Sequence, residues 1–276
     1  MMNRVFVTGR GHGMVGSRMV KLGWSALMSD VTDIVELDTE INRMKPNLIV
    51  HLAAKSGVDL CERPENQKIT DMVNFMGAVN VFELAEKHSI PVVHISSDHI
   101  FSGDWWGSYQ EDATDLKPKN HYGLQKLVAE AASSDFQNVK VVRTSTLIYK
   151  NRPSVEWQLD ALQRGETIAS PFFIWRSFMH VDHFVSSILH YADNFRDMPK
   201  VLHISGSKNI SWWRLIKSYA GAYGYDSNKV IPRYRNSTIP GEAARPFRCG
   251  LSTLLSENLG FQQYDYVDAI KQDMSL

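Results

Sequence analysis

Apolar residues along the first two thirds of the chain fall into short continuous runs that alternate with longer amphipathic stretches. Continuous apolar runs of this length are typical of strands that are buried on both faces, as in a parallel sheet. The longer stretches keep a helical spacing of apolar positions. The pattern therefore predicts a doubly wound, parallel α/β sheet. We expect strands at 5–7, 48–52, 91–95, 139–143 and 201–204, and helices at 14–22, 65–88 and 122–132.

The pattern changes after residue 149, where prolines divide the chain into shorter pieces and aromatic residues become frequent. This change predicts a smaller C-terminal lobe beside the sheet. We expect the sheet domain to consist of residues 1–149 and 176–205, and the lobe of residues 150–175 and 206–276.

A glycine-rich turn joins the first expected strand to the first expected helix, with the spacing Gly11-x-Gly13-x-x-Gly16. Glycines at this spacing let the backbone turn sharply and approach a pyrophosphate, whose charge then lies at the helix N-terminus. The context predicts a Rossmann-type dinucleotide-binding domain; the alternative is a tight turn without a ligand. An acidic residue that closes the second strand is the usual companion, but the stub at 25–28 carries none.

A serine, a tyrosine and a lysine are expected to form a carbonyl-reduction site. Ser97 follows the strand at 91–95, at the carboxyl edge where open α/β sheets bind ligands. Tyr122 and Lys126 are four residues apart, on one face of the following helix. We expect Lys126 to lower the pKa of Tyr122, Tyr122 to donate a proton and Ser97 to hold the substrate oxygen. A solvated helix face is the alternative for this pair, as it is for Tyr225 and Lys229.

Several motifs in the same order resemble the extended short-chain dehydrogenase/reductases, and within them the dTDP-4-dehydrorhamnose reductases. They are His-Leu-Ala-Ala-Lys-Ser-Gly-Val-Asp at 51–59, His-Ile-Ser-Ser-Asp-His-Ile-Phe-Ser-Gly at 94–103, Pro-x-Asn-x-Tyr-Gly-x-x-Lys at 118–126, and Arg-Thr-Ser at 143–145. The resemblance covers most of the chain. It implies NAD(P)H-dependent reduction of the 4-keto group of a nucleotide-linked 6-deoxy sugar, with the C-terminal lobe binding the substrate.

The glycine turn and this resemblance together assign the expected ligand contacts. We expect the cofactor to contact Gly9, Arg10, Gly11, Gly13, Met14, Val15, Gly16, Asp30, Val31, Leu52, Ala53, Ala54, Lys55, Asn74, Tyr122, Lys126 and Arg143. We expect the substrate to contact Val58, Ser97, Asp98, His99 and Arg245. The resemblance places Asp30 near the adenine, Asn74 at a structural and proton-relay position, and Arg245 at the substrate diphosphate, with Arg248 as a weaker candidate.

Cofactor choice depends on the charges beside the glycine turn. Arg10 and Arg18 flank this turn, and either could meet a 2′-phosphate or remain a surface charge. We expect NADPH rather than NADH, because no clear acidic residue is available to bind a free ribose 2′-hydroxyl.

The motifs leave other functions open. A glycine turn with one extra residue also resembles GDP-fucose synthase, an epimerase/reductase, and other nucleotide-sugar epimerases or dehydratases share many of the motifs. Thr146-Leu147 stands where relatives carry an aromatic residue after Arg-Thr-Ser. An alternative from another class is a non-catalytic dinucleotide-binding regulatory subunit, against which the intact Ser97, Tyr122 and Lys126 argue.

Composition narrows the remaining classes of protein and partner. Lys and Arg together number 30 and so do Asp and Glu, which argues against a nucleic-acid partner. Two cysteines in 276 residues exclude a disulfide scaffold, and no apolar run reaches the length of a membrane span, so we expect a cytoplasmic protein. We expect no metal, because His180 and His183 lack a third ligand. The resemblance implies a homodimer through the helices at 65–88 and 122–134. Trp105-Trp106 could stack on a nucleotide or anchor a buried loop.

Overall fold

The structure, a computed structural model, describes residues 4–234 and 242–275. Its centre is a six-stranded sheet in the order β10-β5-β4-β3-β1-β2, in which all neighbouring strands are parallel. The strands are β1 (Val5–Val7), β2 (Ser25–Ala26), β3 (Leu48–His51), β4 (Val92–Ser97), β5 (Val139–Thr144) and β10 (Val201–His203). Every expected strand is present, and the expected doubly wound Rossmann-like architecture is confirmed.

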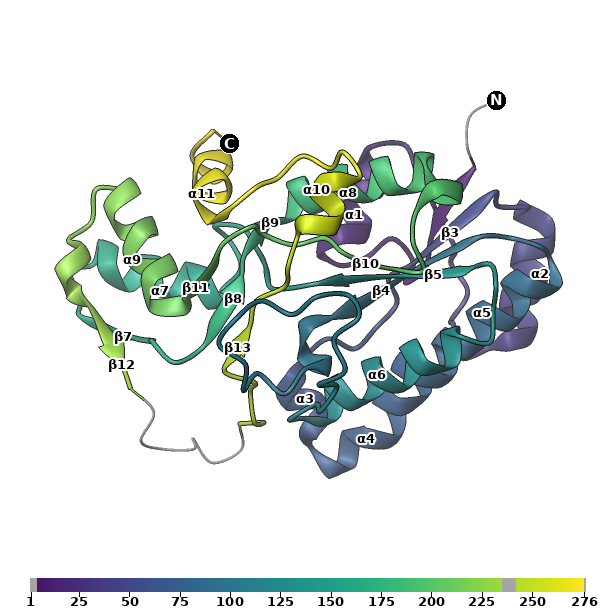
Figure 1. Ribbon diagram of the computed structural model, residues 1–276, viewed down its shortest axis with the longest axis horizontal. Helices are drawn as coiled ribbons and strands as arrows, with labels where there is room; N and C mark the ends of the chain where they lie inside the picture. Colours follow the sequence, from purple (N-terminus) through teal and green to yellow (C-terminus); the bar gives the residue numbers. More distant parts are fainter. Residues whose placement is uncertain (1–3, 235–241, 276) are drawn as a thin grey trace.

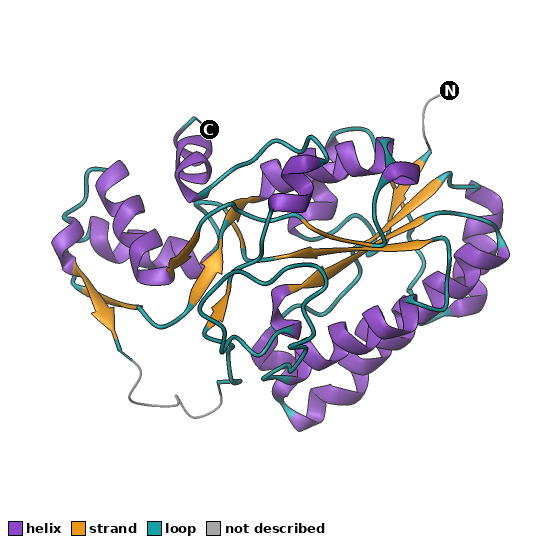
Figure 2. Cartoon of the chain, in the orientation of Figure 1, coloured by secondary structure: helices purple, strands orange, loops and turns teal. Residues whose placement is uncertain are grey.

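Helices cover both faces of this sheet, as Figures 1 and 2 show. On one face lie α1 (Met14–Lys21) and α8 (Val181–Asp193), and on the other lie α2 (Ile34–Met44), α5 (Gly77–Lys87) and α6 (His121–Ser133). Within β1, Val5 and Val7 belong to the core of the first face, whereas Phe6 belongs to the core of the second. Because both faces are buried, apolar residues in these strands occur in consecutive runs rather than at every second position.

The helix expected at 65–88 is interrupted in its middle. It consists of α4 (Pro64–Asp71), a five-residue π-helical turn, η1 (Met72–Met76), and α5. The π-turn buries the side chain of Asn74, which is 1% exposed. Just after it, a Cβ on Gly77 would lie 2.5 Å from Cγ2 of Val31, so the glycine allows the helix to pass close to the loop after β2. Turns of this kind often occur at functional positions.

The C-terminal part of the chain builds a second, smaller core. Its helices are α7 (Pro153–Gln163), α9 (Trp212–Ala222) and α11 (Tyr266–Met274). Its strands form small sheets and are β6 (Leu147–Ile148), β7 (Ile168–Pro171), β8 (Trp175–Ser177), β9 (Met179–His180), β11 (Asn209–Ser211), β12 (Val230–Arg233) and β13 (Arg248–Cys249). Leu215, Ile216 and Tyr219 of α9 pack in this core, and Trp212 and Trp213 pack against it. The exact division of the chain into two domains stays a prediction.

The remaining short elements join these layers. They are α3 (Val58–Glu62), α10 (Leu254–Asn258), and the one-turn helices η2 (Asp98–Ile100), η3 (Phe195–Asp197) and η4 (Ser227–Lys229). Across residues 4–234 and 242–275, every helix is too short or too polar to span a bilayer.

Candidate active site

A cavity of about 490 Å³ opens at the carboxyl ends of β1, β3, β4 and β5. The glycine turn lines one part of it, and Ser97, Tyr122 and Lys126 line another. Most of the expected contacts surround it, namely Gly9, Gly13, Met14, Val15, Gly16, Leu52, Ala53, Ala54, Val58, Ser97, Asp98, His99, Tyr122 and Lys126. The structure therefore brings the expected cofactor turn and the expected catalytic residues to one place.

Other expected contacts lie outside this lining, namely Arg10, Gly11, Asp30, Val31, Lys55, Asn74, Arg143 and Arg245. Arg143 is 5% exposed and binds Glu130 through Nε and Nη2, at 3.0 and 2.9 Å. Its side chain thus belongs to a buried ion pair and not to the cavity wall. Val31 is likewise buried, against the Gly77 turn. The sequence motifs alone do not reveal that these two side chains are packed inside the protein.

The backbone of the glycine turn fits a dinucleotide. A Cβ on Gly16 would lie 3.3 Å from the carbonyl carbon of Gly11, so a side chain here would push the turn away from the start of α1 by a few tenths of an ångström. Gly13 has a φ of 86°, and a Cβ placed there would meet none of the described atoms within 4 Å. Gly13 therefore presents bare backbone to the cavity directly before α1. Backbone amides at such a helix N-terminus favour an anion such as a diphosphate.

Close packing of α6 against the loop after β4 brings Tyr122 to Ser97. A Cβ on Gly123 would lie 2.3 Å from the carbonyl oxygen of His99, so the helix can approach only because this residue is glycine. Asn120 caps the helix by accepting a hydrogen bond from the amide of Gly123 at 2.8 Å. Lys126 is buried and donates from Nζ to the carbonyl oxygen of Ile95 at 2.7 Å.

Burial shifts the pKa values of both Tyr122 and Lys126. It raises the pKa of Tyr122 above the ordinary value, while a hydrogen bond with Ser97 acts in the opposite direction. Burial also lowers the pKa of Lys126 to about 8. The pKa of Tyr122 therefore shifts upward, opposite to the lowering expected from Lys126, because burial is the largest cause of the shift. The phenol is held neutral, which is the form that can donate a proton.

Asp98, an expected substrate contact, uses its carboxylate within the protein. Ser145 donates from Oγ to Oδ2 at 2.7 Å, and Nε of Arg176 lies 3.3 Å from the same oxygen. Asp98 and Arg176 are each 2% exposed, and burial raises the pKa of Asp98. Arg176 comes from β8, so this buried ion pair ties the smaller core to the end of β4 beside Ser97.

His99 faces the edge of the Tyr122 ring, with ring centroids 5.7 Å apart. Asn120 donates from Nδ2 to Nδ1 of His99 at 3.1 Å. Burial, with smaller contributions from nearby arginines, lowers the pKa of His99 to about 3, so this imidazole is neutral at physiological pH.

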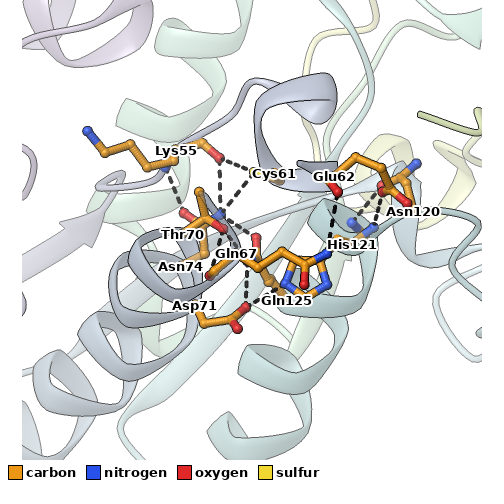
Figure 3. A network of polar contacts seen from close by, with 11 residues as sticks. Lys55, Cys61, Glu62, Gln67, Thr70, Asp71, Asn74, Asn120, His121 and Gln125 are labelled. Atoms are coloured by element: carbon orange, nitrogen blue, oxygen red, sulfur yellow. Dashed lines mark hydrogen bonds and ion pairs between the residues drawn. The ribbon is translucent and has the colours of Figure 1, made fainter. Parts of the chain in front are cut away.

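Asn74 joins the loop after β3 to α6 through the polar network in Figure 3. Its Oδ1 accepts from the amide of Lys55 at 2.7 Å, and its Nδ2 donates to the carbonyl oxygen of Lys55 at 3.0 Å and to Oε1 of Gln125 at 2.7 Å. Gln125 in turn donates to Thr70 at 2.8 Å and to Asp71 at 2.7 Å. Asn74 thus holds the loop at Lys55 against α6. The sequence motifs did not identify its partner Gln125, although Gln125 directly precedes Lys126 in the chain.

The arginines considered as ligand contacts differ in whether an acidic side chain binds them. Arg18 is bound to Asp182 at 2.5 Å, whereas the side chain of Arg10 is exposed and, among the described residues, donates only to the carbonyl oxygen of Met28, at 3.0 Å. Arg245 binds the two oxygens of Asp59 at 2.6 and 2.7 Å, so its expected role at a diphosphate stays a prediction.

Trp105 and Trp106 are exposed, which excludes the buried loop anchor. Arg248, the weaker diphosphate candidate, lies over the Trp106 ring at 3.2 Å from its centroid.

Within the described part of the chain, no group of three His, Cys, Asp or Glu side chains is placed to hold a metal ion. His180 is hydrogen-bonded to Asp273 at 3.2 Å. Further residues line the cavity that sequence reasoning did not single out for it, namely His12, Ser56, Thr144 and Arg152.

Comparison with known proteins identifies the family. The family described as RmlD substrate binding domain matches residues 2–275. The chain is 27% identical over 224 residues to the dTDP-4-keto-6-deoxy-D-glucose reductase of Streptomyces niveus, covering 79% of this chain and 74% of that protein. It is 25% identical over 169 residues to the "Probable low-salt glycan biosynthesis reductase Agl14" of Haloferax volcanii, covering 58% of this chain and 55% of that protein.

Among solved structures, the dTDP-4-dehydrorhamnose reductase of Bacillus anthracis in complex with NADP superposes with a TM-score of 0.87 and 22% identity. That match covers 99% of this chain and 98% of the other, and it confirms the expected fold. The order of motifs, the cavity and the match over nearly the whole length agree. The chain belongs to the RmlD substrate binding domain family.

Proposed function

We propose that this protein reduces the 4-keto group of a nucleotide-linked 6-deoxy sugar, with NADPH as the hydride donor. The observation that carries the proposal is the meeting of Ser97, Tyr122 and Lys126 with the glycine turn in one cavity. The substrate class follows from the name of the Streptomyces relative, a dTDP-4-keto-6-deoxy-D-glucose reductase. The cytoplasmic location expected from the sequence stays a prediction.

The residues divide the reaction between them. The nicotinamide, when bound, supplies the hydride to the carbonyl carbon. Ser97 donates a hydrogen bond to the carbonyl oxygen, and Tyr122, held neutral by burial, gives its phenolic proton to that oxygen. The ketone thus gains one hydride and one proton and becomes an alcohol. The ammonium of Lys126 stabilises the phenolate that remains until solvent reprotonates it.

NADPH is favoured over NADH by the charges around β2. Glu40 lies beside the segment that follows this strand. Its carboxylate is buried and accepts hydrogen bonds from the amides of Met28 and Ser29 at 3.0 and 2.8 Å. Asp30 accepts from the amide and hydroxyl of Thr32 at 2.9 and 2.8 Å. Both carboxylates are thus engaged by neighbouring groups, whereas Arg10 is exposed in the glycine turn and suits a 2′-phosphate.

We also propose a homodimer through α4, η1 and α6. Ile69, Met72 and Met76 are exposed at helical spacing along α4 and η1, and Leu124 and Val128 are exposed four residues apart on α6. Figure 1 shows α4 and α6 side by side, and α6 contacts η1. A second copy of this surface would cover these apolar side chains with its own, as the two-fold symmetry of most dimers requires.

The test is turnover of purified protein with NADPH and a dTDP-4-keto-6-deoxy sugar. Oxidation of NADPH, followed by its near-ultraviolet absorbance, together with formation of the sugar alcohol supports the proposal. Binding of both ligands without turnover would support the non-catalytic regulatory subunit. The stereochemistry of the product, read by NMR, distinguishes simple reduction from reduction combined with epimerisation.

A further inference from the structure

Arg152 lines the cavity and is the residue that precedes α7, in the turn after β6. It is half-buried, and Nη1 donates to the carbonyl oxygen of Leu147. No aspartate or glutamate within residues 4–234 and 242–275 forms an ion pair with it. Burial lowers the pKa of its guanidinium, which shows that the charged form is poorly hydrated at this position.

Other arginines around the site are paired with acidic side chains. The pairs are Arg18 with Asp182 at 2.5 Å, Arg143 with Glu130 at 2.9 Å, Arg176 with Asp98 at 3.3 Å, and Arg245 with Asp59 at 2.6 Å. Asp98 is the carboxylate in the cavity wall whose charge acts on Arg152, but its Oδ2 is already bound by Arg176 and Ser145. Each of these arginines therefore has a carboxylate partner, whereas Arg152 has none in the described part of the chain.

An unpaired guanidinium in a partly dehydrated cavity is unfavourable unless something supplies the opposite charge. Lys126 also lines this cavity and donates only to a backbone carbonyl among the described residues. Among the described residues, the cavity wall thus presents two cations, Lys126 and Arg152, and one carboxylate, Asp98, which is already paired. A ligand with several negative charges complements this balance, and the planar fork of a guanidinium matches the oxygens of a phosphate.

The turn that carries Arg152 lies close to the start of α1. The guanidinium of Arg18 stacks on the ring of Tyr149, 5.1 Å from its centroid, and its Nη1 donates to the carbonyl oxygen of Met14 at 2.9 Å. Met14 follows Gly13 in the glycine turn. Arg152 therefore belongs to the wall that faces both the N-terminus of α1 and the Ser97–Asp98 end of β4.

We propose that Arg152 binds a phosphate group of a diphosphate ligand in this cavity and supplies the charge that the protein leaves uncompensated. This inference rests on the proposed function, because both the dinucleotide and the nucleotide sugar carry a diphosphate. The shared chemistry is the diphosphate, and binding measurements with each ligand identify which one Arg152 contacts.

The test compares Arg152→Gln with wild type and with Arg164→Gln. Arg164 is the C-cap residue of α7, is exposed and pairs with Glu166 at 2.6 Å, so it controls for loss of one positive charge near the same helix. Dissociation constants are measured by calorimetry for NADPH, for dTDP and for inorganic pyrophosphate. We expect Arg152→Gln to weaken pyrophosphate and one of the two nucleotides at least tenfold, which corresponds to about 1.4 kcal/mol. Arg164→Gln should change each constant less than twofold.

The outcomes separate this inference from the proposed function. Loss for NADPH alone assigns Arg152 to the cofactor, and loss for dTDP alone assigns it to the substrate. Unchanged constants for all three ligands in folded Arg152→Gln, or equal losses in Arg164→Gln, overturn the inference while the proposed function stands. If the wild type binds pyrophosphate but neither nucleotide, the proposed function fails and the pyrophosphate comparison still decides the role of Arg152.

Thermal melting establishes that each variant is folded. Should Arg152→Gln fail to fold, Arg152→Lys serves in its place, because it keeps the charge and removes the planar fork. We expect Arg152→Lys to weaken pyrophosphate about threefold, between wild type and Gln. An unchanged pyrophosphate constant in Arg152→Lys, with Gln unfolded, would also count against the inference.

Discussion

Replacing Gln125 by leucine tests the network that joins the loop after β3 to α6. Gln125 is 3% exposed, and its amide forms three hydrogen bonds, to Asn74, Thr70 and Asp71. Leucine has a similar size, so the main loss is of hydrogen bonds and not of packing. Two neutral bonds at about 1 kcal/mol each and one bond to a carboxylate at about 2 kcal/mol give a destabilisation of roughly 4 kcal/mol.

The assay is equilibrium unfolding in urea, with Gln67→Leu as the control. Gln67 lies in the same network, but its side chain forms one long hydrogen bond among the described residues, to the carbonyl oxygen of Glu62 at 3.4 Å. We expect Gln67→Leu to lower the free energy of unfolding by less than about 1 kcal/mol. If Gln125→Leu is no more destabilising than this control, the buried amide is not integral to the packing of α6, and the reasoning is wrong.

Three further predictions concern association, cofactor choice and pH. Met76→Glu, which places a charge on the exposed apolar face of η1, should convert a dimer to a monomer in light scattering; a dimer that persists would place the interface elsewhere. Arg10→Ala should weaken NADPH about tenfold in calorimetry and leave NADH within about twofold, whereas equal losses would mean that Arg10 does not meet the 2′-phosphate. Burial lowers the pKa of His51 to about 3, so the unfolded chain binds the extra proton below about pH 6.5, and stability present at neutral pH is lost on acidification. His51→Asn should therefore reduce the slope of the unfolding free energy with pH, between about pH 6 and pH 4, by up to about 1.4 kcal/mol per pH unit. An unchanged slope in the folded variant would contradict this assignment to His51.

Local patterns predicted the parts of the fold that depend on neighbouring residues. The strands of the sheet, the glycine turn and the pairing of Tyr122 with Lys126 all follow from short segments whose spacing determines their geometry. The end of β4 could be placed beside the start of α6 because parallel strands direct their carboxyl ends to one edge. These are the features on which the position of the cavity depends.

Long-range contacts could not be predicted from the sequence. Arg143 was expected at the cofactor, but nothing in its own segment indicates that Glu130 of α6 binds it. The pairing of Asp98 with Arg176 joins two parts of the chain that only the tertiary fold brings together. The neutral state of Tyr122 depends on how completely the folded protein excludes water, which a spacing of four residues does not reveal.

The most direct test of the central claim is turnover by Tyr122→Phe. This variant removes one hydroxyl from a residue in the cavity wall and leaves the glycine turn intact. We predict that NADPH binds with unchanged affinity while kcat for reduction of a dTDP-4-keto-6-deoxy sugar falls by about 10² or more, the usual loss for a general acid. Near-normal turnover by folded Tyr122→Phe would contradict the assignment of Tyr122 as the proton donor.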